Sequence, residues 1–541
     1  MLGTMMNYPL TLTHILERAG KLFPEVQVLS RLPDRSLHHY TYADVYRRAR
    51  LLAEALLKAG IRRGDRVATL MWNHYAHLEA YLGIPAAGAV MHTLNLRLSP
   101  HDLAYIANHA GDRFLIVDDI LLPLFDKFKA SVKLERVIVV PLCREPIPDG
   151  YQNYEHLLAS ASGDFSYPQL DENEAASLCY TSGTTGVPKG VAYSHRSAVL
   201  HSFLMTTVDN FGICHADVVL PVVSMFHVNG WGLPYACSLS GSKLVLPGPH
   251  LDAESILDLI TSEQVTVAGG VPTIWFNVVD AMEKHPGRWK IPPMRVVIGG
   301  AAPPEALIRQ LDRYGMTVLQ GWGLTESSPQ ATVPLLKTYM KDWPAERKYA
   351  VRAKAGMTVP FVEMRIMNEA GAEVARDGMT MGEIQLRGPW VASSYYNLPE
   401  EKTKWTGDGW FRTGDVGTMD EDGCLKIVDR TKDLIKSGGE WISSVDVENA
   451  LVAHPAVREA AVVAVPHPKW QERPVALVVL RNGAEATHEE LRDFLLRTFA
   501  KWQLPDAFLF LDELPHTSTG KLLKTELRRR YQNWNWTGDV K

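Results

Sequence analysis

The stretch Tyr180–Gly190 carries the densest set of residues that could bind an anion. It reads Tyr-Thr-Ser-Gly-Thr-Thr-Gly-Val-Pro-Lys-Gly and follows an apolar run that predicts a strand. A strand that runs into such a loop presents backbone N–H groups, hydroxyls and a lysine to one point, as a polyphosphate requires. The loop is not a Walker A motif, because Lys189 lies between Pro188 and Gly190. An ordinary polar turn has the same composition, so the loop alone does not distinguish a phosphate-binding loop from such a turn.

Two later stretches could complete a nucleotide site. In Gln320–Glu326, Trp322 offers an aromatic face to a flat ring, and Glu326 offers a carboxylate oxygen of the kind that binds Mg²⁺. Asp415 ends the run Phe-Arg-Thr-Gly-Asp, and a carboxylate at the end of a strand suits two vicinal ribose hydroxyls. A buried Trp, a surface Glu and a turn Asp are the ordinary alternatives, so each stretch is a weak signal when taken alone.

Two stretches near the C-terminus carry lysines. Lys432–Ser443 holds two lysines, a Gly-Gly pair and Trp441, and Pro515–Lys521 predicts a tight turn that projects Lys521. Most lysines in such turns are solvated. A catalytic role for Lys521 therefore needs support from outside its own neighbourhood.

Composition and charge limit the class of protein. The 541 residues are 46% hydrophobic and 22% charged, with a formal net charge of −5, which argues against a nucleic-acid binder. Five scattered cysteines without zinc-ligand or redox spacing favour free thiols in a reducing compartment. The N-terminus lacks a signal-peptide pattern, and the most apolar window, Val218–Leu239, contains polar residues and two prolines. We therefore expect a cytoplasmic protein without a membrane span, and leave peripheral membrane contact open.

Short apolar runs alternate with segments of helical periodicity through most of the chain. The pattern predicts helices over 12–23, 42–59 and 77–88, and strands over 66–71, 114–118, 136–140, 218–220, 243–246, 265–269, 295–299 and 317–320. Such alternation indicates an α/β fold whose parallel-rich sheets are covered by helices. From about residue 355, two-residue periodicity with Gly and Pro between the runs predicts a small antiparallel subdomain.

The length of the chain predicts more than one domain. We place the boundary after a predicted strand at 424–428, which separates a large N-terminal domain, 1–428, from a smaller α+β domain, 429–541. The smaller domain contains predicted helices near 444–453 and 487–498 and strands at 460–465, 475–480 and 507–511.

Taken together and in this order, the five stretches resemble the core motifs of the ANL superfamily of adenylate-forming enzymes. The resemblance runs from about Tyr40 to Lys524, and Val222–Trp231 with Ile435–Trp441 looks closest to bacterial medium- and long-chain fatty-acyl-CoA synthetases. It implies a two-step reaction that uses ATP, Mg²⁺ and coenzyme A. A carboxylate attacks the α-phosphorus of ATP and expels pyrophosphate, and the coenzyme A thiol then attacks the acyl-adenylate.

The resemblance assigns most of the site to the nucleotide. It implies that the β- and γ-phosphates lie against Thr181, Ser182, Gly183, Thr184, Thr185, Gly186 and Lys189. Thr184 and Glu326 would hold Mg²⁺. The residues implied around adenine, ribose and the coenzyme A channel are Gly300, Ala301, Gln320, Gly321, Trp322, Thr325, Asp415, Arg430, Lys432, Lys436, Gly438, Gly439 and Trp441.

The remaining implied roles concern the acid and a mobile C-terminal domain. His227 resembles the residue that flanks the acyl carboxylate, Val228 lies beside it, and Trp231 resembles the indole that gates the acyl tunnel. Without the resemblance, this apolar run would be read as core. The C-terminal domain would rotate about a hinge at 429–432 between the two steps. The implied catalytic residues are Lys521, His227, Thr184 and Glu326.

Two departures from the family pattern bear on specificity. Trp322 stands where many relatives carry Tyr, and Gly230 adds backbone freedom before Trp231, so the chain-length preference stays open. The same chemistry on a short, sulfur-containing or aryl acid is one alternative. A catalytically silent acyl- or nucleotide-binding protein is another, although the chain keeps Lys189, Glu326 and Lys521. The expected partners are the acid, ATP and coenzyme A, with a homodimer implied by the resemblance.

Overall fold

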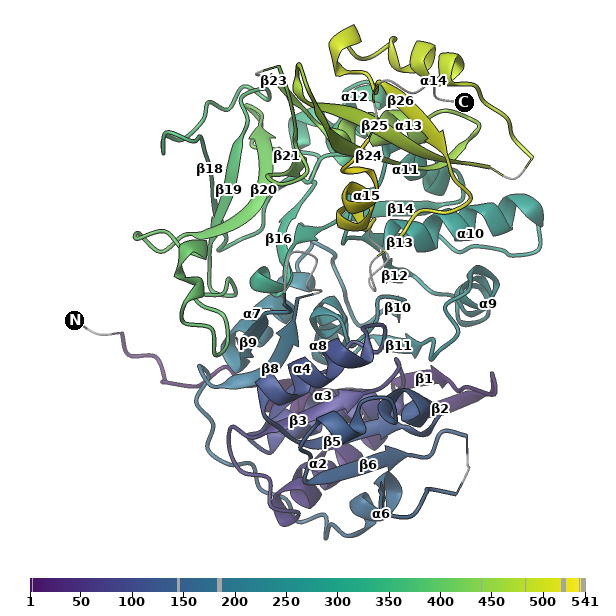
Figure 1. Cartoon of the computed structure of the whole chain (residues 1–541). Coiled ribbons are helices and arrows are strands. Elements are labelled where there is room, and N and C mark those ends of the chain that lie inside the picture. Colours follow the sequence, from purple (N-terminus) through teal and green to yellow (C-terminus); the bar gives the residue numbers. More distant parts are fainter. Residues whose placement is uncertain are drawn as a thin grey trace.

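A computed structural model describes residues 1, 3–143, 146–181, 187–438, 440–481, 483–516, 522–534 and 536. These residues build two large sheets, two smaller antiparallel sheets of three and four strands, and a C-terminal α+β unit that contains the yellow end of the colour scale (Figure 1). The predicted α/β class, with parallel-rich sheets, an antiparallel part and an α+β C-terminal part, is confirmed.

The first large sheet has seven strands, and the predicted phosphate loop connects the last two of them. Its strands are parallel except for the last pair, which is an antiparallel hairpin. In spatial order the strands are β7 (Gln152–Asn153), β6 (Arg136–Val140), β5 (Asp112–Asp118), β3 (Arg66–Leu70), β4 (Val90–Thr93), β8 (Ala175–Tyr180) and β9 (Gly190–Ser194). The stretch Tyr180–Gly190 is therefore the connection of the β8–β9 hairpin.

The second large sheet also has seven strands, and its parallel part was predicted. Its order is β14 (Met316–Gln320), β13 (Met294–Ile298), β12 (Val267–Gly270), β10 (Val218–Pro221), β11 (Lys243–Leu246), β1 (Gln27–Arg31) and β2 (Leu37–Thr41). The antiparallel β1–β2 hairpin is an addition that the sequence analysis did not predict. It joins the far edge because β1 pairs in parallel with β11.

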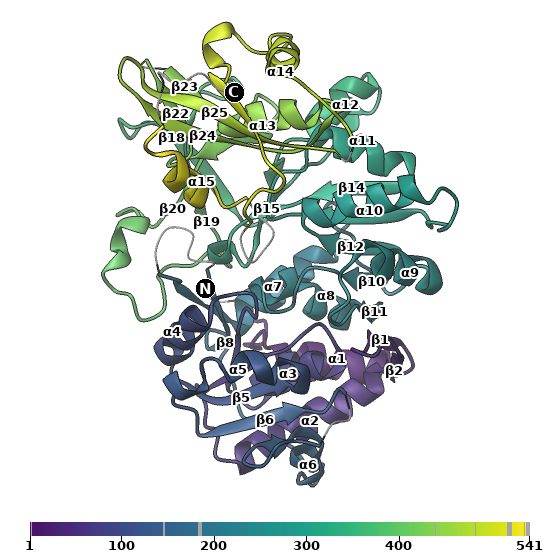
Figure 2. The same ribbon diagram turned by 45° about the vertical axis from the view of Figure 1, so that its right-hand side comes forward.

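Helices cover both faces of the two sheets. One core contains residues from both sheets and from the helices α1 (Leu12–Leu22), α2 (Tyr42–Lys58), α3 (Tyr75–Ala86), α7 (His195–Met205) and α8 (Leu233–Ser240). Separate clusters bury the opposite faces under α4 (Pro100–Ala110) and α5 (Leu122–Phe125), and under α9 (Ala253–Glu263), α10 (Pro272–Lys284) and α11 (Glu305–Arg313). Figure 2 shows α1, α3, α7 and α8 between the two sheets. Because both faces are buried, the strands read as continuous apolar runs.

Local sequence signals explain where the principal helices begin and end. The Thr41 hydroxyl and the Asp44 carboxylate form a capping box at the start of α2. Ser99 caps α4, Pro100 occupies its first turn, and Gly111 ends it with φ +67°. These signals set the register of α4, which carries His109 in its last turn.

The C-terminal half completes the fold with a three-stranded antiparallel sheet of β15 (Trp322–Gly323), β16 (Gln330–Val333) and β17 (Met357–Thr358), and with two further antiparallel-rich sheets. The first contains β18 (Glu363–Met367), β19 (Gly382–Arg387), β20 (Phe411–Met419) and β21 (Leu425–Arg430). The second contains β23 (Glu440–Ile442), β22 (Ile435–Ser437), β25 (Gln471–Leu480), β24 (Val457–His467) and β26 (Ala507–Phe510), with α13 (Ser444–Val452), α14 (His488–Leu495) and α15 (Lys524–Tyr531). Across the described ranges, no helix is long and apolar enough to cross a membrane.

Candidate active site

The β8–β9 hairpin holds both ends of the predicted phosphate loop. The Thr181 N–H donates to the Lys189 carbonyl at 3.0 Å, and the Lys189 N–H donates to the Thr181 hydroxyl at 3.0 Å. The register pairs Tyr180 with Gly190. The five central residues lie outside the described part of the chain: Ser182, Gly183, Thr184, Thr185 and Gly186.

Lys189 and Glu326 are brought together through Tyr395. The Lys189 ammonium lies 2.7 Å from a Glu401 carboxylate oxygen and 5.2 Å from the centre of the Tyr395 ring. The Tyr395 hydroxyl donates to the Glu326 carboxylate at 2.5 Å, and Glu326 is buried. The predicted cation and the predicted Mg²⁺ ligand therefore share one neighbour. Sequence reasoning missed Tyr395 and Glu401, because neither belongs to a recognisable motif.

Backbone contacts fix the Gln320–Glu326 loop against the hairpin. The Tyr193 hydroxyl, from β9, donates to the Thr325 carbonyl at 2.6 Å. The Ala392 N–H donates to the Glu326 carbonyl at 2.7 Å. Since Tyr193 and Ala392 come from different parts of the chain, the position of Glu326 depends on the tertiary fold as well as on its own loop.

The strand ends β13 and β14 bring together groups suited to a nucleobase. The Gln320 side-chain oxygen is buried and has no hydrogen-bond partner among the described residues. A buried acceptor without a partner costs about 1–3 kcal/mol. The Gly321 N–H donates to the Ile298 carbonyl at 2.8 Å, and Gly300 and Ala301 are exposed just beyond β13. Gln320 thus ends β14, and the exposed Gly300 and Ala301 follow the end of its paired neighbour β13.

Asp415 lies next to the predicted aromatic face. The Trp322 indole N–H donates to one Asp415 carboxylate oxygen at 3.2 Å, and Arg430 Nε lies 3.5 Å from the other oxygen. Asp415 pairs with Arg430 across β20 and β21. The structure therefore brings three predicted nucleotide residues into one cluster, although they are far apart in the sequence.

The segment after Arg430 contributes a lysine, Lys432, whose pKa is shifted. Burial, with further repulsion from Arg430 and Arg528, lowers the pKa of Lys432 to about 8. Lys436 lies over the Trp441 ring at 4.4 Å, because the β22–β23 hairpin pairs the two residues. Near the start of the following turn, Gly438 adopts φ +62° and donates to the Trp470 carbonyl at 2.9 Å. Two predicted residues of this region lie outside the described ranges: Gly439 and Lys521.

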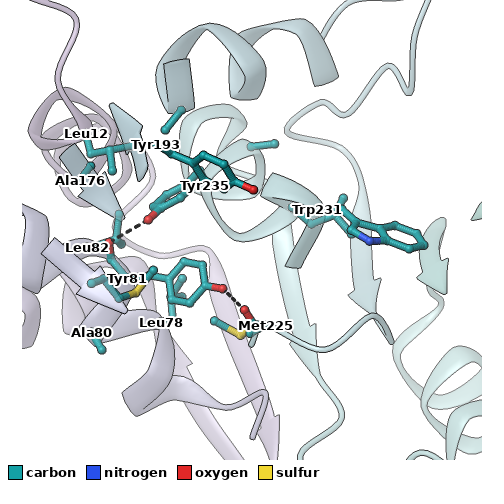
Figure 3. Packing of buried hydrophobic residues seen from close by; sticks show 14 of the residues in the cluster. Leu12, Leu78, Ala80, Tyr81, Leu82, Ala176, Tyr193, Met225, Trp231 and Tyr235 are labelled. Atoms are coloured by element: carbon teal, nitrogen blue, oxygen red, sulfur yellow. Dashed lines mark hydrogen bonds between the residues drawn. The ribbon is translucent and has the colours of Figure 1, made fainter. Parts of the chain in front are cut away.

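The predicted acid-binding segment is anchored to the first sheet. The Asn73 side chain, just after β3, donates to the Pro221 and Val223 carbonyls at 3.0 and 2.9 Å and accepts from the Met225 N–H at 2.8 Å. The Tyr81 hydroxyl donates to the Met225 carbonyl, as Figure 3 shows. The segment that leads to His227 is therefore held by Asn73, which follows β3, and by Tyr81 of α3.

Val228–Gly232 forms a left-handed turn directly after His227. Its five consecutive residues have φ values of 46°, 50°, 56°, 56° and 76°. Each non-glycine residue in this region costs roughly 1–2 kcal/mol. Buried hydrogen bonds offset part of the cost, since the Asn229 amide donates to Ser177 at 2.7 Å and accepts from the Cys179 thiol at 3.2 Å. The freedom predicted from Gly230 thus appears as part of a longer turn with a defined conformation.

This turn presents the Trp231 indole to the carboxyl ends of the second sheet. A Cβ placed on Gly299 would lie 3.3 Å from Cη2 of the indole, and one placed on Gly269 would lie 4.0 Å from Cε3. Trp231 is only 7% exposed. The indole therefore lies close to two glycines at the carboxyl ends of β12 and β13, where neither residue has a side chain.

The two helix-covered sheets, the smaller antiparallel sheets and the α+β C-terminal unit, with this cluster at the strand ends, define an adenylate-forming enzyme of the ANL superfamily. The chain belongs to the AMP-binding enzyme family: the family pattern matches residues 16–396, and that of the AMP-binding enzyme C-terminal domain matches residues 446–521. It is an acyl-CoA ligase that works through an acyl-adenylate.

Individual relatives cover nearly the whole chain. A long-chain-fatty-acid–CoA ligase of Thermus thermophilus is 50% identical, with 98% of this chain and 97% of the relative covered. A 3-methylmercaptopropionyl-CoA ligase of Ruegeria pomeroyi is 44% identical, with 98% and 99% covered. A crystal structure of an anthranilate CoA ligase in complex with anthranoyl-AMP has a TM-score of 0.85 at 25% identity and covers 97% of this chain and 98% of that one.

Proposed function

We propose that the acid is a medium- to long-chain fatty acid, which the enzyme converts to its acyl-CoA. The observation that carries the proposal is the buried Trp231 indole, which lies over two glycines at the strand ends and beside a predominantly apolar core. An indole in this position would form one wall of an aliphatic tunnel. The Thermus relative, a long-chain-fatty-acid–CoA ligase at 50% identity, supports the same substrate class.

A shorter acid, such as a sulfur-containing one, is the second candidate. The Trp231 indole lies close to Gly299, and an indole that stayed in this position would limit the length of the acyl chain. The 44% identical 3-methylmercaptopropionyl-CoA ligase also favours this alternative. Both candidates share the same chemistry and differ only in what the acyl site accepts.

For the first step we propose that the β8–β9 loop binds the pyrophosphate part of ATP, with Lys189 as its cation. Adenine would lie against Trp322 and use the open Gln320 acceptor for its amino group, and Asp415 with Arg430 would bind the ribose. Positioning and charge neutralisation would supply most of the rate enhancement, because an anion must approach a polyanion. The bond that breaks lies between the α- and β-phosphates, so the loop holds the leaving group.

Glu326 and Thr184 are the residues that would hold Mg²⁺. The donor set fits, since Mg²⁺ sites commonly use one or two carboxylates together with substrate phosphates. Among the described residues no group of three His, Cys, Asp or Glu side chains could form a protein-only metal cage. The ion would neutralise phosphate charge. Tyr395 would hold Glu326 in place through its 2.5 Å hydrogen bond.

Lys521 is proposed to act between the α-phosphate and the carboxylate, with His227 beside the acid. A domain boundary near 429, a hinge at 429–432, homodimerisation and a cytoplasmic location stay predictions of the resemblance. If the C-terminal domain changes position between the two steps, Lys521→Ala abolishes acyl-adenylate formation but largely spares thioester formation from supplied acyl-adenylate. Equal losses in both half-reactions would contradict this account.

An acid panel tests the substrate proposal most directly. ATP–pyrophosphate exchange is measured with saturated acids of increasing chain length, with 3-methylmercaptopropionate and with aryl acids. We expect the highest kcat/KM for an aliphatic acid of medium or long chain. Exchange confined to the short or aryl acids would refute the fatty-acid proposal and leave the adenylation chemistry in place.

A further inference from the structure

A histidine outside the predicted site contacts the base of the phosphate-binding hairpin. The Tyr180 hydroxyl lies 2.7 Å from His109 Nδ1. Tyr180 is the last residue of β8 and directly precedes Thr181, while His109 belongs to the last turn of α4. The end of the first hairpin strand, β8, is thus hydrogen-bonded to helix α4.

The same histidine also contacts the segment that covers the second strand. The His109 ring packs edge-on against the Tyr396 ring, with 6.0 Å between the ring centroids. The Tyr396 N–H donates to the Gly190 carbonyl at 2.8 Å, and its hydroxyl donates to the Ala110 carbonyl at 3.3 Å. His109 therefore connects the end of β8 to the residues that hold the start of β9.

The segment that His109 secures reaches the charged groups of the site. Tyr395 donates to Glu326, and Glu401 forms an ion pair with Lys189. Residues 395–401 thus contact Lys189 and Gly190 at the start of β9, and the predicted Mg²⁺ ligand Glu326. A shift of this segment would therefore displace Lys189, Gly190 and Glu326 together.

We propose that His109 is a positioning residue for the phosphate-binding hairpin, and that it acts through the Tyr180 hydroxyl and the Tyr396 ring. The inference rests on the proposed role of the β8–β9 loop in binding the β- and γ-phosphates. A neutral imidazole suits this task, because its unprotonated ring nitrogen can accept a hydrogen bond from the Tyr180 hydroxyl. Burial lowers the pKa of His109, which keeps the ring neutral near pH 7.

Small displacements at such a hairpin have large consequences. A misplacement of about 1 Å at groups that position a substrate can cost about a hundredfold in rate. The hydrogen bond between His109 and Tyr180 lies at the base of the hairpin, whereas the hydrogen bond between Trp322 and Asp415 belongs to the predicted adenine and ribose groups. Loss of the His109–Tyr180 hydrogen bond should therefore weaken interactions with the β- and γ-phosphates selectively.

Equilibrium binding of ATP and of AMP to the full-length enzyme tests the proposal, because AMP lacks the two outer phosphates. Tyr180→Phe removes only the hydroxyl, and His109→Ala removes the imidazole that contacts Tyr180 and Tyr396. We expect each to weaken ATP binding by about three- to tenfold and AMP binding by less than about twofold, with the double variant no worse than the weaker-binding single one. The matched control is His101→Ala on the same helix, whose side chain is 93% exposed. It should leave both affinities unchanged.

Three results would overturn the proposal: unchanged ATP affinity in Tyr180→Phe, equal weakening of ATP and AMP, or additive losses in the double variant. Equal weakening would indicate a general structural role. Because the binding assay needs no acid, a failure of the fatty-acid proposal in the exchange panel is distinguishable from a failure of the proposal that His109 positions the hairpin.

Discussion

Replacement of Trp322 by Phe separates two roles of this side chain. Phenylalanine keeps an aromatic face for adenine but lacks the indole N–H that donates to Asp415 at 3.2 Å. Hydrogen bonds to charged groups contribute about 1.5–3 kcal/mol. The distance is longer than the 2.7–2.9 Å typical of charge-assisted bonds, so we take the lower end, about 1.5 kcal/mol, or roughly tenfold in affinity.

The assay compares ATP with 2′,3′-dideoxy-ATP, which lacks both ribose hydroxyls. If the indole orients Asp415 for the ribose, Trp322→Phe should reduce the preference for ATP over the dideoxy analogue by about tenfold. The dideoxy analogue should itself bind almost equally well to both enzymes. Arg430, at 3.5 Å from the other Asp415 oxygen, is 40% exposed and would hold the carboxylate less firmly.

Trp289→Phe is the matched control. The Trp289 indole donates to Asp258 at 2.8 Å in an exposed pair outside the site cluster, so its loss removes the same kind of bond. It should leave the preference unchanged. Equal losses for ATP and the dideoxy analogue in Trp322→Phe would show that the indole serves only as a face for adenine, and would refute the reasoning.

Two further predictions follow from altered protonation. Because burial lowers the pKa of Lys432 to about 8, AMP affinity should fall as the pH rises through about 8, and Lys432→Arg should abolish that decline in a titration from pH 7 to 9.5. Burial raises the pKa of Glu448 from 4.5 to about 7, although Lys524 lies 2.6 Å away. Its contribution to stability is therefore complete below pH 4.5 and lost as the pH rises through about 7, on the order of 2–3 kcal/mol. Urea unfolding at pH 5 and pH 8 should show this loss in the wild type and a smaller one in Glu448→Gln.

Much of the fold could be predicted because its strands carry their own signal. The strand predicted at 136–140 corresponds to β6, and the helix predicted at 42–59 to α2, which ends at Lys58. The β1–β2 hairpin was missed, since its polar residues, such as His38 and His39, disguise an edge strand as a loop. Its pairing with β11 is a contact across more than two hundred residues, which no local pattern reveals.

The site was predictable where motifs mark it and hidden where tertiary structure alone assembles it. Trp322, Asp415 and Arg430 were expected to share a nucleotide, and the structure places them in contact. Tyr395 and His109 gave no signal, because each acts through a neighbour that only the folded chain supplies. The left-handed turn around Trp231 was equally unpredictable, since glycine at a single position does not announce five consecutive positive φ values.

An isotope-transfer experiment tests the central claim most directly. The best acid from the panel is prepared with both carboxylate oxygens as ¹⁸O and turned over with ATP and coenzyme A. Attack of the carboxylate on the α-phosphorus forms an acyl–oxygen–phosphorus link, and attack of the thiol on the acyl carbon then leaves that oxygen on AMP. The account predicts a single ¹⁸O atom in AMP, one retained in the thioester and none in pyrophosphate. Unlabelled AMP, or label in inorganic phosphate together with ADP, would contradict it.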